Sequence, residues 1–450
     1  MNEDTPSLVG VPGSRTTSRV LVDQCYAFLA PLLRELHHGL DRRLVQTFLD
    51  LVLVIVLHRH RSHGLVVSEL GEHLLGARHA PAGVKWIANL LHSPRWSGAV
   101  VEDFLWAQAE QHVHELHASE SEAYVLWDES VLEKPESLKA ERLCAVRSSK
   151  AVRLKRIKPG YFNPPGGRPI CVPGFYWLQI VVIGLRSRPL LAHLHFWTTH
   201  GEAATSRSGE ELTLLHGLAQ RWGRQVVHVW DRGFAGEPWL SAALQHHVRF
   251  IVRWKKGNKL VDAQGTLKKA WEISRGKRSV DHRLIYDARR RCERKTGIVF
   301  LPVQLPHTPV PLWLVVSRPG KGRLPWYLLT NEPITTAEEA WRIVFAYNRR
   351  WQIEMSIRFD KSELAMESPR LPEWTTRWKL LLLAALAQAF LLLLLTPALE
   401  EIRQWLLTVW CHRTGQRSRT AATPLYRLRL ALSNLWKAFR PYSLPRLNPG

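Results

Sequence analysis

The sequence has few cysteines and no apolar run long enough to span a membrane. The five cysteines are scattered through 450 residues without a C-x-x-C pair, which favours a reduced cytoplasmic protein without disulfides or a structural zinc site. The most apolar stretch, Leu380–Leu395, is 16 residues long and contains Gln388. This length predicts a buried core helix rather than a bilayer span. The first 18 residues are polar, so we expect no secretory signal.

Acidic residues are also scarce. The chain has 39 Asp and Glu against 62 Lys and Arg, which gives a net charge of +23, while hydrophobic residues make up 46% of it. The hydrophobic share excludes a disordered chain. A positive surplus of this size on a folded protein predicts a polyanionic partner, and nucleic acid is favoured over acidic lipid. No membrane association is expected.

Two short helical patterns occur in the N-terminal part of the chain, around Val66–Leu75 and Gly83–Leu91. The basic and aromatic segment His92–Trp96 follows them. A helix pair of this kind suits a small DNA-contacting module. Such pairs also serve as plain packing units, so both interpretations stay open.

From Ala123 onward, strand patterns alternate with helical patterns, which predicts a mixed sheet with helices packed on it. Two short apolar strands end in an acid: the run 124–127 is followed by Asp128, and the run 225–230 by Asp231. Side chains at strand ends emerge from the edge of a sheet into a crevice. A lone Asp after a strand is more often a cap or turn residue. A functional role for Asp128 and Asp231 therefore depends on further motifs elsewhere in the chain.

The segment Tyr347–Lys361 reads YNRRWQIEMSIRFDK and contains no Gly or Pro, which predicts one helix. Its polar residues at offsets 0, 3, 7, 11 and 14 fall within roughly 80° of one helical face. These residues are Tyr347, Arg350, Glu354, Arg358 and Lys361. A Glu between cations can hold a divalent cation while its neighbours hold phosphates. A solvated, salt-bridged surface helix is the alternative.

Asp128, Asp231 and Glu354 together form a candidate metal site. Two Asp and a Glu can hold two divalent metals about 4 Å apart, an arrangement that serves phosphodiester transfer. Hard oxygen ligands of this kind favour Mg²⁺ or Mn²⁺.

The pattern Y-x-x-R-x-x-x-E-x-x-x-x-x-x-K resembles the signature of the insertion-sequence-four family of bacterial transposases, which are cut-and-paste DDE enzymes. The chain matches it at Tyr347, Arg350, Glu354 and Lys361. The segment DRGF that starts at Asp231 resembles the second-Asp motif of that family, and Asp128 stands where its first Asp is expected. The segment 326–333, WYLLTNEP, is similar to the strand before the catalytic helix. The resemblance covers about 124–395.

The resemblance implies a role for each candidate residue. Asp128, Asp231 and Glu354 are expected to be the catalytic residues that hold two Mg²⁺ ions, with Mn²⁺ as the substitute. The expected phosphate contacts at the cleaved transposon end are Tyr347, Arg350, Arg358 and Lys361. Trp326 is expected to stack on a flipped-out base, which stabilises the base by about 1–3 kcal/mol, or else to be a core Trp.

The resemblance also implies partners and a fold. The partners are double-stranded DNA, as transposon ends and target, and a second copy of the chain in a homodimer on that DNA. The protein is expected to be cytoplasmic and associated with the bacterial nucleoid when bound.

The fold class that the resemblance implies is α/β, a ribonuclease-H-like mixed sheet interrupted by a β-rich insertion. The expected segments are a flexible tail (1–18), a helical N-terminal DNA-contacting domain (19–118), the first part of the catalytic core (119–254), the β-rich insertion (255–335), the catalytic helix with the end of the core (336–398) and a basic, helical C-terminal region (399–450).

The chain departs from the family pattern after the first Asp. The family usually has Thr or Ser there, whereas this chain has Glu129 followed by Ser130. The extra acid either disturbs the metal site or points to the other face of the strand. A basic run that suits phosphate contact follows, or it is an ordinary exposed loop. The run contains Arg147, Lys150, Arg153, Lys155, Arg156 and Lys158.

Three functions remain in competition. The first is a transposase that binds terminal inverted repeats and catalyses metal-dependent strand cleavage and strand transfer. The second is a metal-dependent nuclease with the same core, which cuts DNA without joining strands. The third is a non-catalytic DNA-binding protein derived from a transposase, and the presence of all three acids weighs against it.

Overall fold

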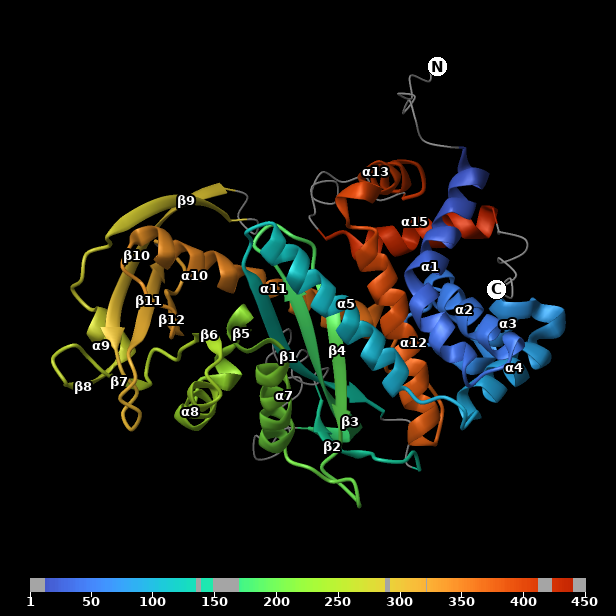
Figure 1. Ribbon diagram of the computed structural model, residues 1–450, viewed down its shortest axis with the longest axis horizontal. Coiled ribbons are helices and arrows are strands. Elements are labelled where there is room, and N and C mark those ends of the chain that lie inside the picture. Colours follow the sequence, from blue (N-terminus) through green and yellow to red (C-terminus); the bar gives the residue numbers. More distant parts are fainter. Residues whose placement is uncertain are drawn as a thin grey trace, which may run out of the picture.

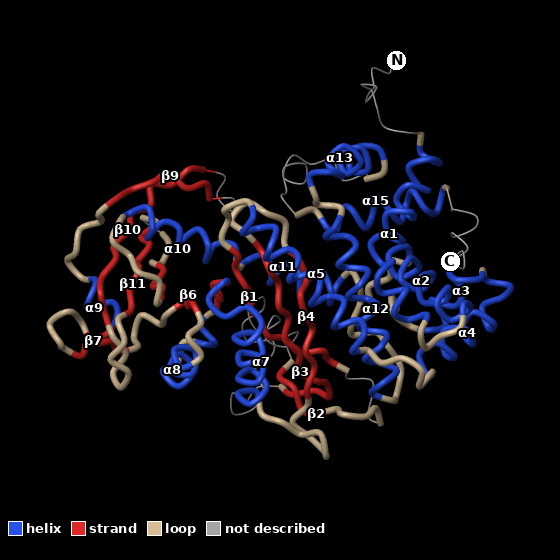
Figure 2. Tube along the Cα trace, viewed as in Figure 1, coloured by secondary structure: helices blue, strands red, loops and turns tan. Residues whose placement is uncertain are grey.

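The structure is a computed structural model that describes residues 13–134, 139–148, 170–287, 292–320, 322–411 and 423–439. A large sheet occupies the middle of the molecule, helices gather at one end, and a β-rich part forms the other end (Figures 1 and 2). The predicted α/β class is confirmed, whereas the narrower ribonuclease-H-like assignment stays a prediction. Most of the basic run after Glu129 lies outside the described residues, as does the tail before residue 13.

A ten-stranded sheet runs in the order β2-β3-β1-β5-β6-β12-β11-β10-β9, with β4 paired to β3. Its strands are β1 (Ala123–Glu133), β2 (Cys144–Arg147), β3 (Cys171–Ile183), β4 (Leu190–Trp197), β5 (Val226–Trp230), β6 (Arg249–Arg253), β9 (Asp281–Asp287), β10 (Cys292–Val303), β11 (Leu312–Arg318) and β12 (Trp326–Thr330). β1, β5 and β6 are parallel to one another, and the other pairings are antiparallel. A separate two-stranded sheet consists of β7 (Lys259–Val261) and β8 (Leu267–Lys269).

The β-rich segment before α10 is continuous with the core sheet. We expected an insertion over 255–335, and β9 to β12 do fall in that range. However, β12 pairs with β6, with Leu328 opposite Arg253. The insertion therefore extends the sheet and places its last strand next to a core strand.

Helices flank the sheet and gather beside it. They are α1 (Ser14–His37), α2 (Arg42–Leu57), α3 (Val67–Leu75), α4 (Ala80–His92), α5 (Ala99–Ala118), α7 (Arg207–Trp222), α8 (Glu237–Gln245), α9 (Ala270–Ser274), α10 (Ala337–Arg349), α11 (Trp351–Ser362), α12 (Trp374–Leu393), α13 (Glu400–Val409) and α15 (Leu425–Ala438). α1 begins at Ser14, so residues 14–18 of the expected tail are helical, and the rest of that segment up to residue 12 lies outside the described residues.

Helix α12 is the core of the helical bundle. It is long and apolar enough to cross a membrane by length and composition, but 89% of its most apolar window is buried inside the protein. It contacts α2, α4, α5 and α15, so the N-terminal and C-terminal helices pack together around it (Figure 1). The predicted buried core helix at Leu380–Leu395 is confirmed, with its C-terminal boundary at Leu393.

Buried cations cap several helix ends in this bundle. Arg429 of α15 is fully buried and donates to the carbonyl oxygens of Ile55, Val56 and His58 at the end of α2. Lys379 of α12 donates in the same way near the end of α4. The last carbonyls of a helix lack intrahelical donors and carry the negative end of its dipole. Part of the positive charge, including part of the basic C-terminal region, therefore stabilises the bundle and does not face a partner.

We expect the substitution Arg429→Met to lower the free energy of unfolding by about 2–4 kcal/mol, because it leaves buried carbonyls without donors. Urea unfolding measures the change. The control is Arg43→Met at the exposed start of α2, which is expected to change stability by no more than about 0.5 kcal/mol. Equal effects of the two substitutions would contradict the capping role of Arg429.

Candidate active site at the edge of the sheet

Asp128, Asp231 and Arg253 occupy corresponding positions, each two residues beyond a paired row of three parallel strands. The register is set two residues earlier, by the paired residues Leu126, Val229 and Ile251. β5 ends at Trp230 and β6 ends at Arg253. Because carboxyl ends of parallel strands meet at one edge of a sheet, Asp128 and Asp231 lie at the same edge, as the sequence predicted.

Asp128 lies within its strand, so the prediction that it ends a strand is wrong. β1 continues to Glu133 because its second half pairs with β3, with Asp128 opposite Gln179 and Glu133 opposite Gly174. Its pairing with β5 stops at Leu126. Asp128 therefore sits where β1 has lost its neighbour on one side, which leaves room for side chains from other elements.

The predicted helix Tyr347–Lys361 is broken at Arg350. α10 ends at Arg349 and α11 begins at Trp351. The amide of Arg350 donates to the carbonyl of Tyr347 at 3.1 Å, three residues back, instead of continuing the four-residue ladder. From this joint the Arg350 guanidinium lies 3.8 Å from Asp128 Oδ2 and also pairs with Glu354.

The three acids act on one another electrostatically. Burial raises the pKa of Asp128 to about 7; Arg350 opposes the shift, and the charges of Asp231 and Glu354 add to it. Three like charges within interaction distance are unfavourable without a cation between them. Arg350 supplies that cation for two of the carboxylates in this structure.

A divalent ion fits the chemistry of this donor set, because carboxylate oxygens suit a hard cation. Across the part of the chain that the structure describes, no three His, Cys, Asp or Glu side chains lie close enough together to hold a metal ion as they stand. Arg350 bridges Asp128 and Glu354. Metal binding therefore requires the three carboxylates to come closer together and Arg350 to leave at least one of them.

Asp231 is held in place by its own loop. Its carboxylate accepts a hydrogen bond from the amide of Gly233 at 2.6 Å and caps the short 3₁₀ turn Arg232–Phe234. A Cβ at position 233 would lie 2.8 Å from Asp231 Oδ1 and 3.4 Å from Arg207 Nη2. A larger residue here would therefore push the Asp231 carboxylate aside, which favours the glycine of the DRGF segment.

We expect Gly233→Ala to displace the Asp231 carboxylate and to reduce metal-dependent DNA cleavage by about 10²-fold, the usual cost of a misplacement near 1 Å. A gel assay of strand cleavage measures this effect. Gly236→Ala is the matched control in the same loop, because a Cβ there would meet its nearest neighbour, Pro238 Cδ, only at 3.9 Å. If both variants cleave at the wild-type rate, the position of Asp231 is not critical.

Glu129 points to the opposite face of the sheet from Asp128. Its carboxylate lies 2.6 Å from Arg207 Nε, and the same nitrogen lies 2.8 Å from Glu211 on α7. Burial raises the pKa of Glu129 to about 7 against the lowering effect of Arg207, and Asp231 contributes to the rise. Glu129 is paired with Arg207 on the α7 face, as the second alternative expects, but its charge also interacts with that of Asp231, so the two alternatives for the extra acid stay open.

An aromatic and cationic cluster borders the acids. The rings of Trp326 and Tyr347 meet edge to face with centroids 5.3 Å apart. Arg253 lies over both rings, at 5.4 Å and 5.9 Å, and Arg350 lies 5.7 Å from the Tyr347 ring. The structure therefore brings two of the predicted DNA-contacting residues, Trp326 and Tyr347, into direct contact.

Arg253 was missed in the sequence, although a signal for it existed. It belongs to no motif, but it ends the third parallel strand, at the position that corresponds to those of the two Asp residues. The other two predicted phosphate contacts lie apart from the cluster. Arg358 is exposed, and the Lys361 ammonium lies 3.8 Å from Glu367 Oε1.

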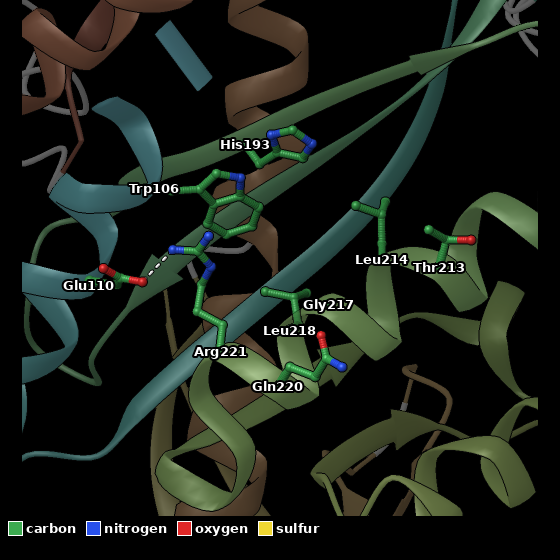
Figure 3. Close-up of a pocket in the computed structure, with 9 residues that line it drawn as sticks. All are labelled: Trp106, Glu110, His193, Thr213, Leu214, Gly217, Leu218, Gln220 and Arg221. Atoms are coloured by element: carbon green, nitrogen blue, oxygen red, sulfur yellow. Dashed lines mark hydrogen bonds and ion pairs between the residues drawn. The ribbon is translucent and has the colours of Figure 1, made fainter. Parts of the chain in front are cut away.

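A separate cavity of about 600 Å³ lies at the far end of α7 (Figure 3). Arg221 pairs with Glu110 there and lies 5.0 Å from the ring of Trp106, which stacks on His193. The other lining residues are Thr213, Leu214, Gly217, Leu218 and Gln220. Because α7 rises about 1.5 Å per residue, Arg221 lies roughly 20 Å along the helix from Arg207. The cavity is therefore not part of the acidic site.

Residues 168–390 match the family model described as Transposase DDE domain. The matched part, just under half of the chain, contains Asp231 and Glu354 and begins after Asp128. It supports a DDE transposase as the class of this protein. The match does not assign the chain to a particular family of DDE transposases, so the resemblance to the insertion-sequence-four family stays a prediction.

Among solved structures, the chain is similar to a piggyBac transposase synaptic complex with hairpin DNA. The identity is 11%, and the alignment covers 98% of this chain and 85% of that chain, with a TM-score of 0.41. At this score a shared fold is not established.

Proposed function

We propose that the protein is a cut-and-paste DNA transposase, which binds the terminal inverted repeats of an insertion sequence and catalyses metal-dependent strand cleavage and strand transfer. One observation carries the proposal. The carboxylates of Asp231 and Glu354, inside the matched domain, both act on the half-buried carboxylate of Asp128 at one sheet edge. Acids gathered in this way suit phosphodiester chemistry.

In this proposal Asp128, Asp231 and Glu354 bind Mg²⁺, or Mn²⁺ in its place. The bound metal supplies Lewis acidity, which activates the attacking oxygen and stabilises the leaving oxygen. Asp231 is prepositioned by its bond to the Gly233 amide. Glu354 stands on the first turn of α11, one helical turn from Arg350.

Arg350 acts as the exchangeable cation. Without DNA it neutralises Asp128 and Glu354. With DNA bound, its planar guanidinium takes a phosphate instead, since arginine binds phosphate and carboxylate with the same fork geometry. Tyr347, Arg358 and Lys361 contact further phosphates of the cleaved end, and Trp326 stacks on a displaced base.

One active site serves both reactions, because each is an in-line attack at phosphorus. Water attacks first, and the phosphodiester bond breaks to leave a 3′-hydroxyl on the element. That hydroxyl then attacks a target phosphodiester, whose leaving oxygen takes up a proton. The two ends have to be held together during joining, so we infer a homodimer on DNA. We also propose that the protein acts in the cytoplasm, on the nucleoid when bound.

The test is an incubation of the full chain with Mg²⁺, a duplex carrying the inverted repeats that flank the gene, and a target plasmid. A transposase gives nicked ends and plasmid joined to the duplex. Cleavage without any joined product would identify the nuclease alternative. If the wild type binds the duplex but cleaves it no more than a variant in which one of the acids is replaced by its amide, the non-catalytic alternative is correct.

A further inference from the structure

A second pair of acids bridged by an arginine lies on the face of β1 opposite the proposed metal site. Arg207 is the first residue of α7, and its Nε lies 2.6 Å from Glu129 on β1 and 2.8 Å from Glu211 on α7. Burial raises the pKa of both acids, and the charge of Asp231 adds to the rise. Asp231 therefore stands between two groups of acids, one on each face of β1.

The two groups differ in which partner faces the solvent. On the α7 face the side chains of Glu129 and Glu211 are 14% and 9% exposed, whereas that of Arg207 is 49% exposed. On the other face the relation is reversed, since the side chain of Arg350 is 12% exposed and that of Glu354 is 33% exposed. Arg207 therefore lies on the solvent side of its two acids and covers them.

Arg207 also contacts the loop that holds Asp231. Its guanidinium lies 5.9 Å from the ring centroid of Phe234, in the turn that follows Asp231. A Cβ on Gly233 in the same turn would lie 3.4 Å from Arg207 Nη2. One arginine thus joins β1, α7 and the Asp231 loop.

Removal of Arg207 would leave acids beside Asp231 without the cation that now pairs with them. Like charges at this distance are unfavourable without a counter-charge, and carboxylate oxygens bind divalent cations. A divalent ion would therefore be drawn to Glu129 and Glu211 on the α7 face. Asp231 would then be shared between that ion and the proposed metal site.

We propose that Arg207 is a positioning residue for the proposed metal site. It holds the extra acid Glu129 on the α7 face and keeps metal ions from it, so that Asp231 is left to the other two acids of the site. The inference rests on the proposed function, because it concerns the same metal site. It gives the acid that departs from the family pattern a partner that compensates for its charge.

The test compares Arg207→Met, Glu129→Gln and the double variant, each in the full chain, on the duplex that carries the inverted repeats. Arg207→Met is expected to lower cleavage by about 10-fold to 100-fold, the range of coupling between neighbouring charged groups. Glu129→Gln is expected to cleave within about 2-fold of the wild type. Because the double variant lacks the charge of the extra acid, its cleavage is expected to return to within about 2-fold of Glu129→Gln.

A second measurement does not depend on catalysis. Binding of Mn²⁺ to the full chain without DNA is followed by the loss of the electron paramagnetic resonance signal of free Mn²⁺. Arg207→Met is expected to bind one more Mn²⁺ ion than the wild type, and the double variant is expected to lose that ion again. Lower stability also reduces cleavage, but it does not add a metal site, so this readout separates the two causes.

Arg221→Met is the matched control, because Arg221 is a partly exposed arginine on the same helix that pairs with Glu110 away from the acidic site. It is expected to cleave and to bind Mn²⁺ like the wild type. Arg207→Gln removes the charge but keeps a donor for the acids, and it takes the place of Arg207→Met if that variant does not fold. The proposal is overturned if the Arg207 variant binds no additional ion, or if the double variant cleaves no better than the single one.

Failure of this inference can be told apart from failure of the proposed function. An additional ion in Arg207→Met that Glu129→Gln removes, together with a wild type that gives no joined product, leaves the role of Arg207 standing and removes the transposase. Joined product from the wild type, together with equal numbers of bound ions in all variants, gives the opposite result.

Discussion

Replacing Glu354 with glutamine is expected to lower cleavage of the transposon end by at least about 10³-fold, as does loss of a residue on which the chemical step depends. The substitution keeps the size of the side chain and removes its negative charge. Glu354 is a third exposed, and its charge acts on the Asp128 carboxylate. Stability and DNA binding are expected to stay near wild type. A gel assay of strand cleavage beside a binding assay on the same duplex separates the two effects.

The control for this result is Glu338→Gln. Glu338 is an acid on the preceding helix α10, its side chain is 75% exposed, and it pairs with Arg283 away from the acidic site. It is expected to cleave like the wild type. If Glu354→Gln also cleaves at the wild-type rate, Glu354 has no catalytic role and the proposed metal site is wrong.

The coarse fold could be predicted because it depends on local patterns. The apolar run around Leu380 predicted a buried helix, and alternating strands and helices after Ala123 predicted an α/β core. The pairing of strands could not be predicted in the same way. β1 extends past Asp128 only because residues far along the chain, in β3, lie beside it. The continuity of β12 with β6 depends on a similar non-local pairing.

The candidate site was predictable to the extent that it follows a motif. Residue spacing pointed to Asp231 and Glu354, and the structure places both where they act on Asp128. The break at Arg350 could not be predicted, because no Gly or Pro stands near it in the sequence. The helix is interrupted at the residue whose side chain reaches Asp128 on β1. Arg207 was not singled out because a lone arginine outside a motif carries no local signal.

A buried polar network under α11 was also not predicted from the sequence, because its residues lie far apart along the chain. Asp360 directly precedes Lys361 of the signature, yet it points inward and is fully buried. Gln179, the strand partner of Asp128, donates to Asp360 Oδ2 at 2.9 Å. Gln388 of α12 donates to the Ser356 hydroxyl at 2.7 Å. The network links the Asp128 strand pair, the Glu354 helix and the core helix α12.

Asp360→Leu is therefore expected to lower the free energy of unfolding by about 3 kcal/mol, because it leaves the buried Gln179 amide with only its long 3.4 Å bond to Gln388 Oε1. It should also lower cleavage, since α11 loses its polar tie to the β1–β3 pair. Asp360→Asn keeps the shape and an acceptor oxygen, and is expected to retain most of the cleavage. Equal activity and stability in Asp360→Leu would show that the network does not position α11.

Comparison of the wild type with Asp360→Asn also tests the pH dependence of stability. Burial raises the pKa of Asp360 well above its usual range, and hydrogen bonds from Gln179 and Gln388 offset only part of the shift. The carboxyl is therefore protonated in the folded protein at pH values where the unfolded chain has released its proton. Stability due to this group is fully present below about pH 4, the unfolded value, and is lost as pH rises toward the folded pKa.

The difference in unfolding free energy between wild type and Asp360→Asn isolates this group from the other acids. Between pH 5 and pH 7 the wild type is expected to lose stability relative to Asp360→Asn, by up to about 1.4 kcal/mol for each pH unit. Urea unfolding at the two pH values measures the shift, and the exposed substitution Asp103→Asn serves as the control. A difference that does not change with pH would mean that Asp360 is ionised in the folded protein, and that a cation has to lie beside it.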